Sequence, residues 1–312
     1  MKKIKTLILS QQKKLLLLDA NSLLHRAFHA VRPLFSQDGT QVNAVFGFLS
    51  ILTSTIKQQK PNYIVAAFDE KEATFRHQEF AEYKAKRVKA PDELYDQIPL
   101  IKDALCSLGI SVLSCPGFEA DDIIGTISQS QENEEMQVII SSSDNDLLQL
   151  IRKNVCLVKP GKGGILDIFD HQKVLDKFGL SPQQIPDLKG LAGDSSDNIP
   201  GVSGIGPKTA TSLIQKHENL ENIYQNKSQI DQKIWLKLDN NRSKAFLSKK
   251  LATINFEAPI EFNLSESNFP PADFTAIEEF LDRINSTTLK NRVLALKDLY
   301  KKSKVQQKLF DF

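Results

Sequence analysis

The chain has 312 residues, of which 41% are hydrophobic and 25% are charged, and its formal net charge is +2. This length allows a substantial hydrophobic core, and the composition is that of an ordinary globular protein, which excludes intrinsic disorder. No apolar run approaches the roughly 20 residues that span a bilayer, and the patch at 6–9 is too short for a secretory signal. We therefore expect a cytoplasmic protein without membrane association.

Cysteine usage excludes two further classes. Cys106, Cys115 and Cys156 are an odd number without C-x-x-C spacing, which argues against a disulfide framework and against a thiolate zinc site. Buried, inert thiols are the simpler interpretation.

Apolar patterns in residues 1–180 predict an α/β domain. Runs at 15–18, 63–68, 111–113 and 137–142 are typical of buried strands, and 155–159 and 165–169 are also β-like. Apolar residues at helical spacing predict a helix across 42–56, and another is expected at 120–127. This alternation predicts a mainly parallel twisted sheet flanked by helices on both faces.

After residue 180 the sequence consists of turn-forming residues followed by segments with helical periodicity. This pattern predicts a smaller helical part across 181–300, with one further strand at 259–264. Residues 301–312, KKSKVQQKLFDF, show no core pattern, and we expect them to form a flexible tail.

Acidic side chains follow the predicted strands. Asp19, Asp69 and Asp144 come at or just beyond strand ends, and the carboxyl ends of parallel strands meet at one edge of a sheet. Further acids lie at a predicted helix start and in turns, namely Glu119, Asp121, Asp122, Asp146, Asp194 and Asp197. Each one alone is typical of a turn or a helix cap.

Taken together, these nine carboxylates indicate a metal centre. So much like charge in one place is unfavourable unless cations neutralise it. Oxygen donors without histidine or cysteine suit Mg²⁺ or Mn²⁺ rather than zinc. Two such ions can activate water and stabilise the leaving oxygen of a phosphodiester, so the pattern favours metal-dependent phosphodiester hydrolysis.

Residues 76–90 form a basic stretch. Arg76, Lys84, Lys86, Arg87 and Lys89 face only two acidic residues there. Such a stretch is either a solvated surface or the binding surface of a polyanion, and charge alone does not decide between them. Lys84 and Arg87 are three residues apart, which on a helix places both side chains on one face, suited to a scissile phosphate.

The segment Gly201–Thr209, GVSGIGPKT, is rich in glycine. It is not a Walker loop, because Pro207 separates glycine from lysine and no strand precedes it. We expect a hairpin between helices whose amino-terminal N–H groups meet a DNA phosphate. An ordinary helix-capping turn is the alternative.

Five strings carry a resemblance to a known family: LLLLDANSLLHRAFHA, FDEKEATFRHQEFAEYKAKR, GFEADDIIGT, SSSDNDLLQL and GLAGDSSDNIPGVSGIGPKTA. In this order they resemble the 5′-3′ exonuclease and flap endonuclease family, and above all the nuclease domain attached to bacterial DNA polymerase I. The resemblance runs from Leu15 to Leu299. No polymerase part follows, so the chain looks like a stand-alone form.

The resemblance implies roles for particular residues. One metal group would include Asp19, Asp69, Glu119 and Asp121, with Asp122 and Asp144 beside it. A second group would include Asp144, Asp146, Asp194 and Asp197. A helical arch would span 72–99, with Tyr83, Lys84 and Arg87 as its functional positions. Family members often carry glycine or alanine at the position of Ser143 and lysine at the position of Asn145, so this chain departs from the family's local charge there.

The resemblance also implies DNA contacts. Gly204, Gly206, Lys208 and Thr209 would bind a duplex phosphate, with K⁺ held by backbone carbonyls of the same motif. We assign Arg76 to DNA binding as well. Arg26 matches a phosphate contact, although a surface helix residue is an equally good interpretation.

We therefore expect a 5′-3′ exonuclease and flap endonuclease that acts as a monomer on DNA with 5′ flaps, nicks or RNA primers. The alternatives are a non-catalytic DNA-junction binding protein and a ribonuclease with a similar acidic sheet edge.

In the tail, Gln306, Leu309 and Phe310 fit a Q-x-x-L-F pattern that resembles peptides docking into the bacterial sliding clamp. A disordered tail or one that packs on its own domain is the alternative.

Overall fold

The computed structural model describes residues 12–131, 135–271 and 273–310, with side chains as far as Lys301. The strands are β1 (Lys13–Asp19), β2 (Tyr63–Ala67), β3 (Ser111–Leu113), β4 (Met136–Ser141), β5 (Val155–Pro160) and β6 (Leu166–Phe169). The helices of the first part are α1 (Ala20–Ala30), α2 (Asn43–Gln59), α3 (Phe75–Glu79), α4 (Asp92–Tyr95), α5 (Ile98–Ser107), α6 (Ala120–Ser130) and α7 (His171–Phe178). Those that follow are α8 (Ile185–Ala192), α9 (Pro207–His217), α10 (Leu220–Gln225), α11 (Gln232–Asn240), α12 (Arg242–Ala252), α13 (Thr275–Arg283) and α14 (Thr287–Phe310).

The described residues form a six-stranded sheet at the centre of the molecule, in the order β3-β2-β1-β4-β5-β6. All neighbouring pairs are parallel except β5 and β6, which a short turn joins as an antiparallel hairpin. In register, Leu17 of β1 lies between Val65 of β2 and Ile140 of β4. The predicted mainly parallel sheet is confirmed, and the order brings the carboxyl ends of β2, β1 and β4 side by side.

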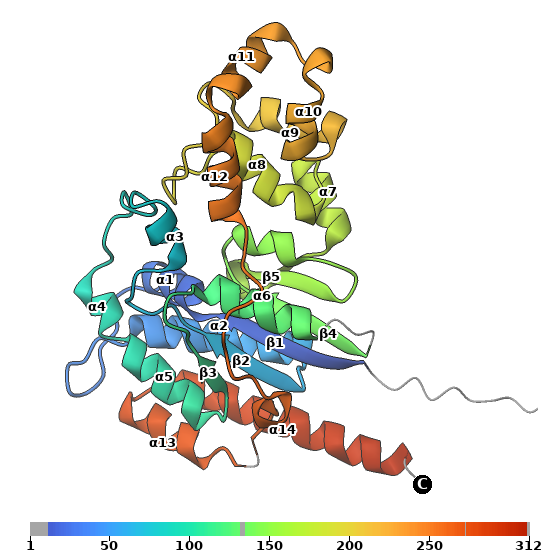
Figure 1. The fold of residues 1–312 in the computed structure, drawn as a ribbon. Coiled ribbons are helices and arrows are strands. Elements are labelled where there is room, and N and C mark those ends of the chain that lie inside the picture. The colour runs from blue at the N-terminus through green and yellow to red at the C-terminus, as the bar shows by residue number, and fades with distance from the viewer. Residues whose placement is uncertain (1–11, 132–134, 272, 311–312) are drawn as a thin grey trace, which may run out of the picture.

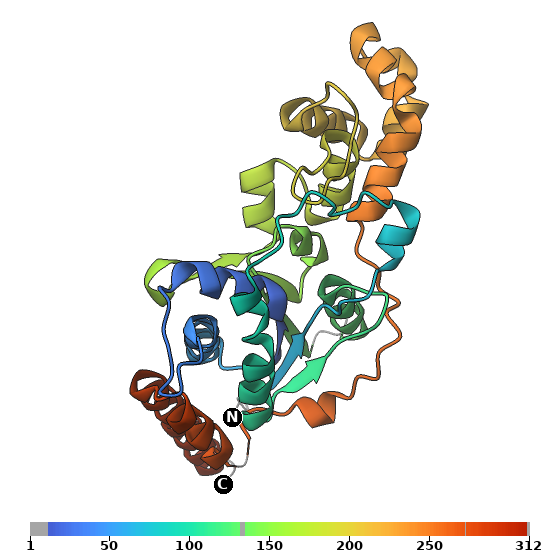
Figure 2. The same ribbon diagram turned by 90° about the vertical axis from the view of Figure 1, so that its left-hand side faces the viewer.

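The two faces of the sheet carry separate cores. Leu16 and Leu18 of β1 point into a cluster built with α1, α2, α5, α13 and α14. Leu15 and Leu17 point to the other face, where they pack with α6 and the 3₁₀ helix η1 (Asp146–Leu150). This alternation explains why β1 is a continuous apolar run, because a strand covered on both faces buries every side chain. Figures 1 and 2 show the helices on either side of the sheet.

The second part, α8–α12, stands beyond one edge of the sheet and has its own core (Figure 1). The sequence predicts that this helical part runs to residue 300, but the last two helices pack in another core. After α12 the chain returns, and α13 and α14 complete the core of the α/β domain through Phe280 and Val293. The helical part therefore ends near Ala252.

Two further expectations differ from the structure. Residues 259–264 form no strand, because Ile260 and Phe262 pack on the core beside α6 instead of joining the sheet. The segment expected to be a flexible tail continues α14 as far as Phe310, while the side chains of residues 302–312 lie outside those described. Within the described residues, no helix is long and apolar enough to cross a membrane.

Candidate nuclease site

The first carboxylates of the site stand where neighbouring strands end. Asp19 is the last residue of β1 and caps α1, because its Oδ1 accepts from the Ser22 N–H at 3.1 Å. Its other oxygen accepts from the Ser142 hydroxyl at 2.5 Å, and Ser142 follows β4. Asp69 follows β2 and accepts from the N–H of Ala120, the first residue of α6, at 2.7 Å. The strand ends and the start of α6 are therefore tied together by these carboxylates.

Further acidic residues line a narrow cavity in this part of the molecule. Glu119, Asp121, Asp144, Asp146 and Asp197 all line it, so the fold brings these five carboxylates together. They come from the start of α6, the loop after β4 and the loop after α8. Tyr83, Lys84 and Arg87 line the same cavity, so a basic segment faces the acidic group directly.

Crowding changes the protonation of the site. Burial, followed by the charges of Asp69 and Asp144, raises the pKa of Asp19 to about 7, although the Ser142 hydrogen bond acts in the opposite direction. Burial and the charges of Asp19 and Asp144 also raise the pKa of Asp121 well above its ordinary value. The carboxyl groups of α6, β1 and the loop after β4 are therefore close enough for their negative charges to repel one another.

Basic side chains of the 83–87 segment pair with two of these carboxylates. The Lys84 ammonium lies 2.6 Å from Glu119 Oε1, and Arg87 Nη2 lies 2.6 Å from Asp197 Oδ1. The Tyr83 hydroxyl spans the same two acids, at 3.1 Å from Glu119 and 3.2 Å from Asp197. Among the described residues, no group of three or more His, Cys, Asp or Glu side chains is arranged closely enough to hold an ion without movement.

The sequence did not single out Lys189 of α8, which lies between two carboxylates. Its ammonium bonds to Asp146 and lies 2.6 Å from Asp194 Oδ2. Burial raises the pKa of Asp146 to about 7 despite this lysine. For Asp194 burial has the same direction, but Lys189 and Ser196 together lower the pKa to about 2. Only the tertiary fold brings Lys189 to Asp146, so no local signal marked it.

The helical face expected to carry Lys84 and Arg87 is absent from the described arch segment. Between α3 and α4 the chain runs through turns, and Lys84 has a left-handed backbone, with φ of 56°. Its N–H donates to the Asp197 carbonyl at 2.9 Å, which fixes this conformation. Lys84 and Arg87 therefore do not share a helical face, and they reach different carboxylates from a turn.

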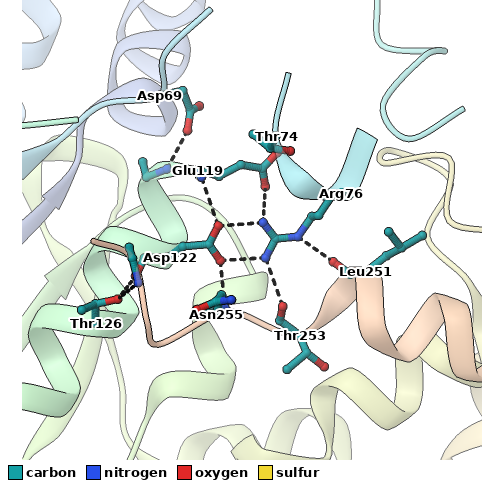
Figure 3. A network of polar contacts seen from close by, with 12 residues as sticks. Asp69, Thr74, Arg76, Glu119, Asp122, Thr126, Leu251, Thr253 and Asn255 are labelled. Atoms are coloured by element: carbon teal, nitrogen blue, oxygen red, sulfur yellow. Dashed lines mark hydrogen bonds and ion pairs between the residues drawn. The ribbon is translucent and has the colours of Figure 1, made fainter. Parts of the chain in front are cut away.

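Arg76, predicted to bind DNA, and Asp122, predicted to lie beside a metal ion, bind each other in the structure (Figure 3). Arg76 Nη1 and Nη2 each lie 2.8 Å from a different oxygen of Asp122, and both residues are buried. Arg76 also donates to the Leu251 carbonyl in the last turn of α12 and to the Thr253 carbonyl just after that helix. Asp122 accepts the Glu119 N–H as part of a helix-capping box. Arg76 is therefore not exposed to DNA, and the oxygens of Asp122 are already bonded.

Arg26 lies elsewhere. It is exposed on α1 and lines a large, mainly apolar cavity between α1, α2, α14 and the β5–β6 hairpin. None of the acidic residues considered above lines that cavity. This position favours the interpretation of Arg26 as a surface helix residue.

The glycine-rich segment forms the turn that leads into α9. Gly206 caps α9 and Pro207 is its first residue, and Gly204 has a φ of 78°, a conformation that favours glycine. Gly204, Gly206 and Lys208 are exposed, whereas Thr209 is half-buried. Lys237 of α11 donates to the Gly204 carbonyl at 2.9 Å. The start of α9 is therefore exposed to solvent, together with the side chain of Lys208.

The fold and site define a parallel α/β protein with an acidic centre at its sheet edge and a basic segment facing it. Residues 14–179 match the family model "5′-3′ exonuclease, N-terminal resolvase-like domain", and residues 180–275 match "5′-3′ exonuclease, C-terminal SAM fold". The chain belongs to the 5′-3′ exonuclease family.

Relatives differ in how much of their length the chain spans. It is 43% identical over 261 residues to DNA polymerase I of Bacillus subtilis, covering 82% of this chain but 29% of the polymerase. It is 37% identical over 286 residues to a 5′-3′ exonuclease of Aquifex aeolicus, covering 90% of this chain and 95% of that protein. T5 5′-exonuclease with bound zinc has a similar fold, with a TM-score of 0.65 at 20% identity over 92% of this chain and 99% of that one.

Proposed function

We propose that the chain hydrolyses DNA phosphodiester bonds near 5′ ends, at flaps, nicks and RNA primers, with Mg²⁺ or Mn²⁺ as cofactor. The observation that carries this proposal is the convergence of Glu119, Asp121, Asp144 and Asp146 on one cavity, opposite Lys84 and Arg87. An acidic group alone would repel a phosphate, and a basic group alone would only bind one. The two together suit a reaction in which cations sit between protein and DNA.

The donor set fits hard divalent ions. Asp19, Asp69, Glu119 and Asp121 would hold one ion, and Asp144, Asp146, Asp194 and Asp197 the second, some through water. All of these donors are oxygens, which hard divalent ions prefer. The pKa values of Asp19 and Asp146 are raised to about 7, which indicates that the basic side chains nearby do not neutralise the carboxylates fully. When bound, divalent ions lower the pKa of a coordinated water and neutralise the phosphate.

The arch residues would bind the reacting phosphate. Lys84 and Arg87 now pair with Glu119 and Asp197, so a phosphate that attracts them would free both carboxylates. Their positive charge would then stabilise the additional negative charge of the transition state. The buried Tyr83 hydroxyl, held between the same acids, would keep the segment against the site.

The DNA duplex would bind to the helical part of the protein, at the start of α9. Gly204, Gly206, Lys208 and Thr209 present the amino end of α9, which is suited to a phosphate of the DNA backbone. Carbonyls of the same turn would hold K⁺. A duplex bound there would be held in place while its 5′ end enters the cavity.

A labelled 5′-flap substrate tests the proposal. We expect cleavage at the flap base with Mg²⁺ and none with a chelator, while DNA binding persists in both conditions. Binding without cleavage under any divalent ion would instead establish a non-catalytic junction-binding protein. Cleavage of single-stranded RNA with no preference for flap DNA would establish a ribonuclease.

We further propose a cytoplasmic monomer that docks on a sliding clamp through Gln306, Leu309 and Phe310. This part rests on the sequence pattern, because those side chains lie outside the described residues. Titration of clamp with the intact chain and with a version ending at Val305 tests it, and equal affinity of the two would refute it.

A further inference from the structure

A lysine on a neighbouring strand holds the loop that follows β4. Lys159 lies near the end of β5, and its ammonium donates to the carbonyl oxygens of Ser143 and Asp144, each at 3.1 Å. It also donates to Asn145 Oδ1 at 2.9 Å. An ammonium has three N–H groups, so all the donors of Lys159 are used on three consecutive residues of one loop.

The same loop carries the carboxylates of the acidic cavity. The Asp146 N–H donates to Asp144 Oδ1 at 2.9 Å, so the direction of the Asp144 side chain depends on the backbone of the loop. The Asp144 N–H in turn donates to the Ser142 hydroxyl, which bonds to Asp19. A shift of the backbone at 143–145 would therefore move several carboxylates together.

Lys159 is itself held in place. Its ammonium lies 5.5 Å from the centre of the Phe169 ring, and Phe169 is a buried residue of β6. Lys177 of α7 approaches the same ring at 4.9 Å and is exposed. Among the described contacts, Lys177 has no hydrogen bond to the 143–145 loop, so it provides a matched lysine that shares the ring but not the loop.

We infer that Lys159 is a positioning residue, which fixes the loop so that the Asp144 and Asp146 carboxylates point into the cavity where cations would bind. The inference rests on the proposed function and deepens it. Some groups do not touch the metal but orient its ligands through hydrogen bonds. Removing such a group commonly lowers metal affinity or activity by about 10- to 100-fold. Lys159 would act in this way through backbone carbonyls, without touching ion or substrate.

The test compares Lys159→Ala, Lys159→Arg and Asn145→Ala with the control Lys177→Ala. Binding of Mn²⁺ to the protein without DNA, followed by electron paramagnetic resonance, gives a readout that is independent of cleavage. We expect Lys159→Ala to weaken Mn²⁺ binding by about 10-fold or more, Asn145→Ala to weaken it less, and Lys177→Ala to leave it unchanged. Lys159→Arg keeps the charge and several donors and should restore most of the affinity.

Flap-DNA affinity measured in a chelator separates the remaining outcomes. For Lys159→Ala we expect this affinity to stay at the wild-type value, together with a fall in kcat rather than a rise in KM. Wild-type Mn²⁺ affinity in both Lys159→Ala and Asn145→Ala would overturn the inference, and so would a loss confined to DNA affinity. If the wild-type chain neither binds Mn²⁺ nor cleaves the flap, the proposed function itself fails, which is a different result.

Discussion

At the scale of single residues, the site is a balance between carboxylates and the basic groups that pair with them. Lys84, Arg87 and Lys189 each lie within 2.6 Å of a carboxylate oxygen, yet Asp19 and Asp146 still have pKa values of about 7. Positive charge from the protein therefore offsets only part of the repulsion. Two measurable consequences follow from this balance.

The first consequence is proton release on metal binding. The folded pKa values of Asp19 and Asp146, each about 7, lie above the ordinary 3.8, so both carboxyls are largely protonated below pH 7 and charged above it. An ion binds only the charged form. Metal affinity should therefore rise with pH, and binding should release protons at about pH 6.5 but few at about pH 8.5. Calorimetry in two buffers of different ionisation enthalpy measures this, and equal release at both pH values would contradict it.

The second consequence concerns Lys84. Lys84→Ala removes the ammonium that we expect to bind the reacting phosphate, so turnover should fall by about 100-fold while flap affinity changes little. Lys86→Ala, which removes an exposed charge from the same segment, is the control. Single-turnover cleavage and equilibrium binding separate the two effects. Equal losses in rate and affinity would make Lys84 a residue that only attracts DNA.

At the scale of elements, the pair Arg76 and Asp122 joins α3, α6 and the end of α12 (Figure 3). Arg76→Ala would leave the buried Asp122 charge without its partner, at a cost of about 3–5 kcal/mol in the free energy of unfolding. Asp122→Ala should be similarly destabilising, and the double variant should lose much less than the sum of the two. Urea unfolding measures all three, and simple additivity would show that the pair does not act as a unit.

The amino end of α9 gives a prediction for DNA binding. Lys208→Ala should weaken duplex binding and reduce the slope of log affinity against log salt by roughly 0.9 for the phosphate contact that is lost. Lys216→Ala removes a charge from the other end of the same helix and should leave the slope unchanged. Slopes from fluorescence anisotropy decide the matter, because identical slopes for wild type and Lys208→Ala would place Lys208 outside the interface.

At the scale of the whole molecule, the sequence predicted what depends on local periodicity. The run Leu15–Leu18 and the acids that follow the strands marked both the sheet and its functional edge. Interactions between distant segments were not predictable in this way. Arg76 and Asp122 are 46 positions apart and Lys189 and Asp146 are 43 apart, so nothing in either local pattern indicates the pairing. For the same reason, α13 and α14 were assigned to the helical part although their apolar faces belong to the α/β core.

Asp144→Asn is the variant that separates DNA cleavage by the acidic cavity with divalent ions, as proposed above, from DNA binding alone. Asp144 lines the cavity, and the substitution removes its charge with little change of shape. We predict that cleavage of a labelled flap falls by about 100-fold or more, because a metal contributes several kcal/mol to the transition state. Flap affinity should be unchanged or higher, and Asp176→Asn, on the exposed surface of α7, should behave as wild type. Near-normal cleavage by Asp144→Asn would show that this cavity is not the metal-dependent cleavage site.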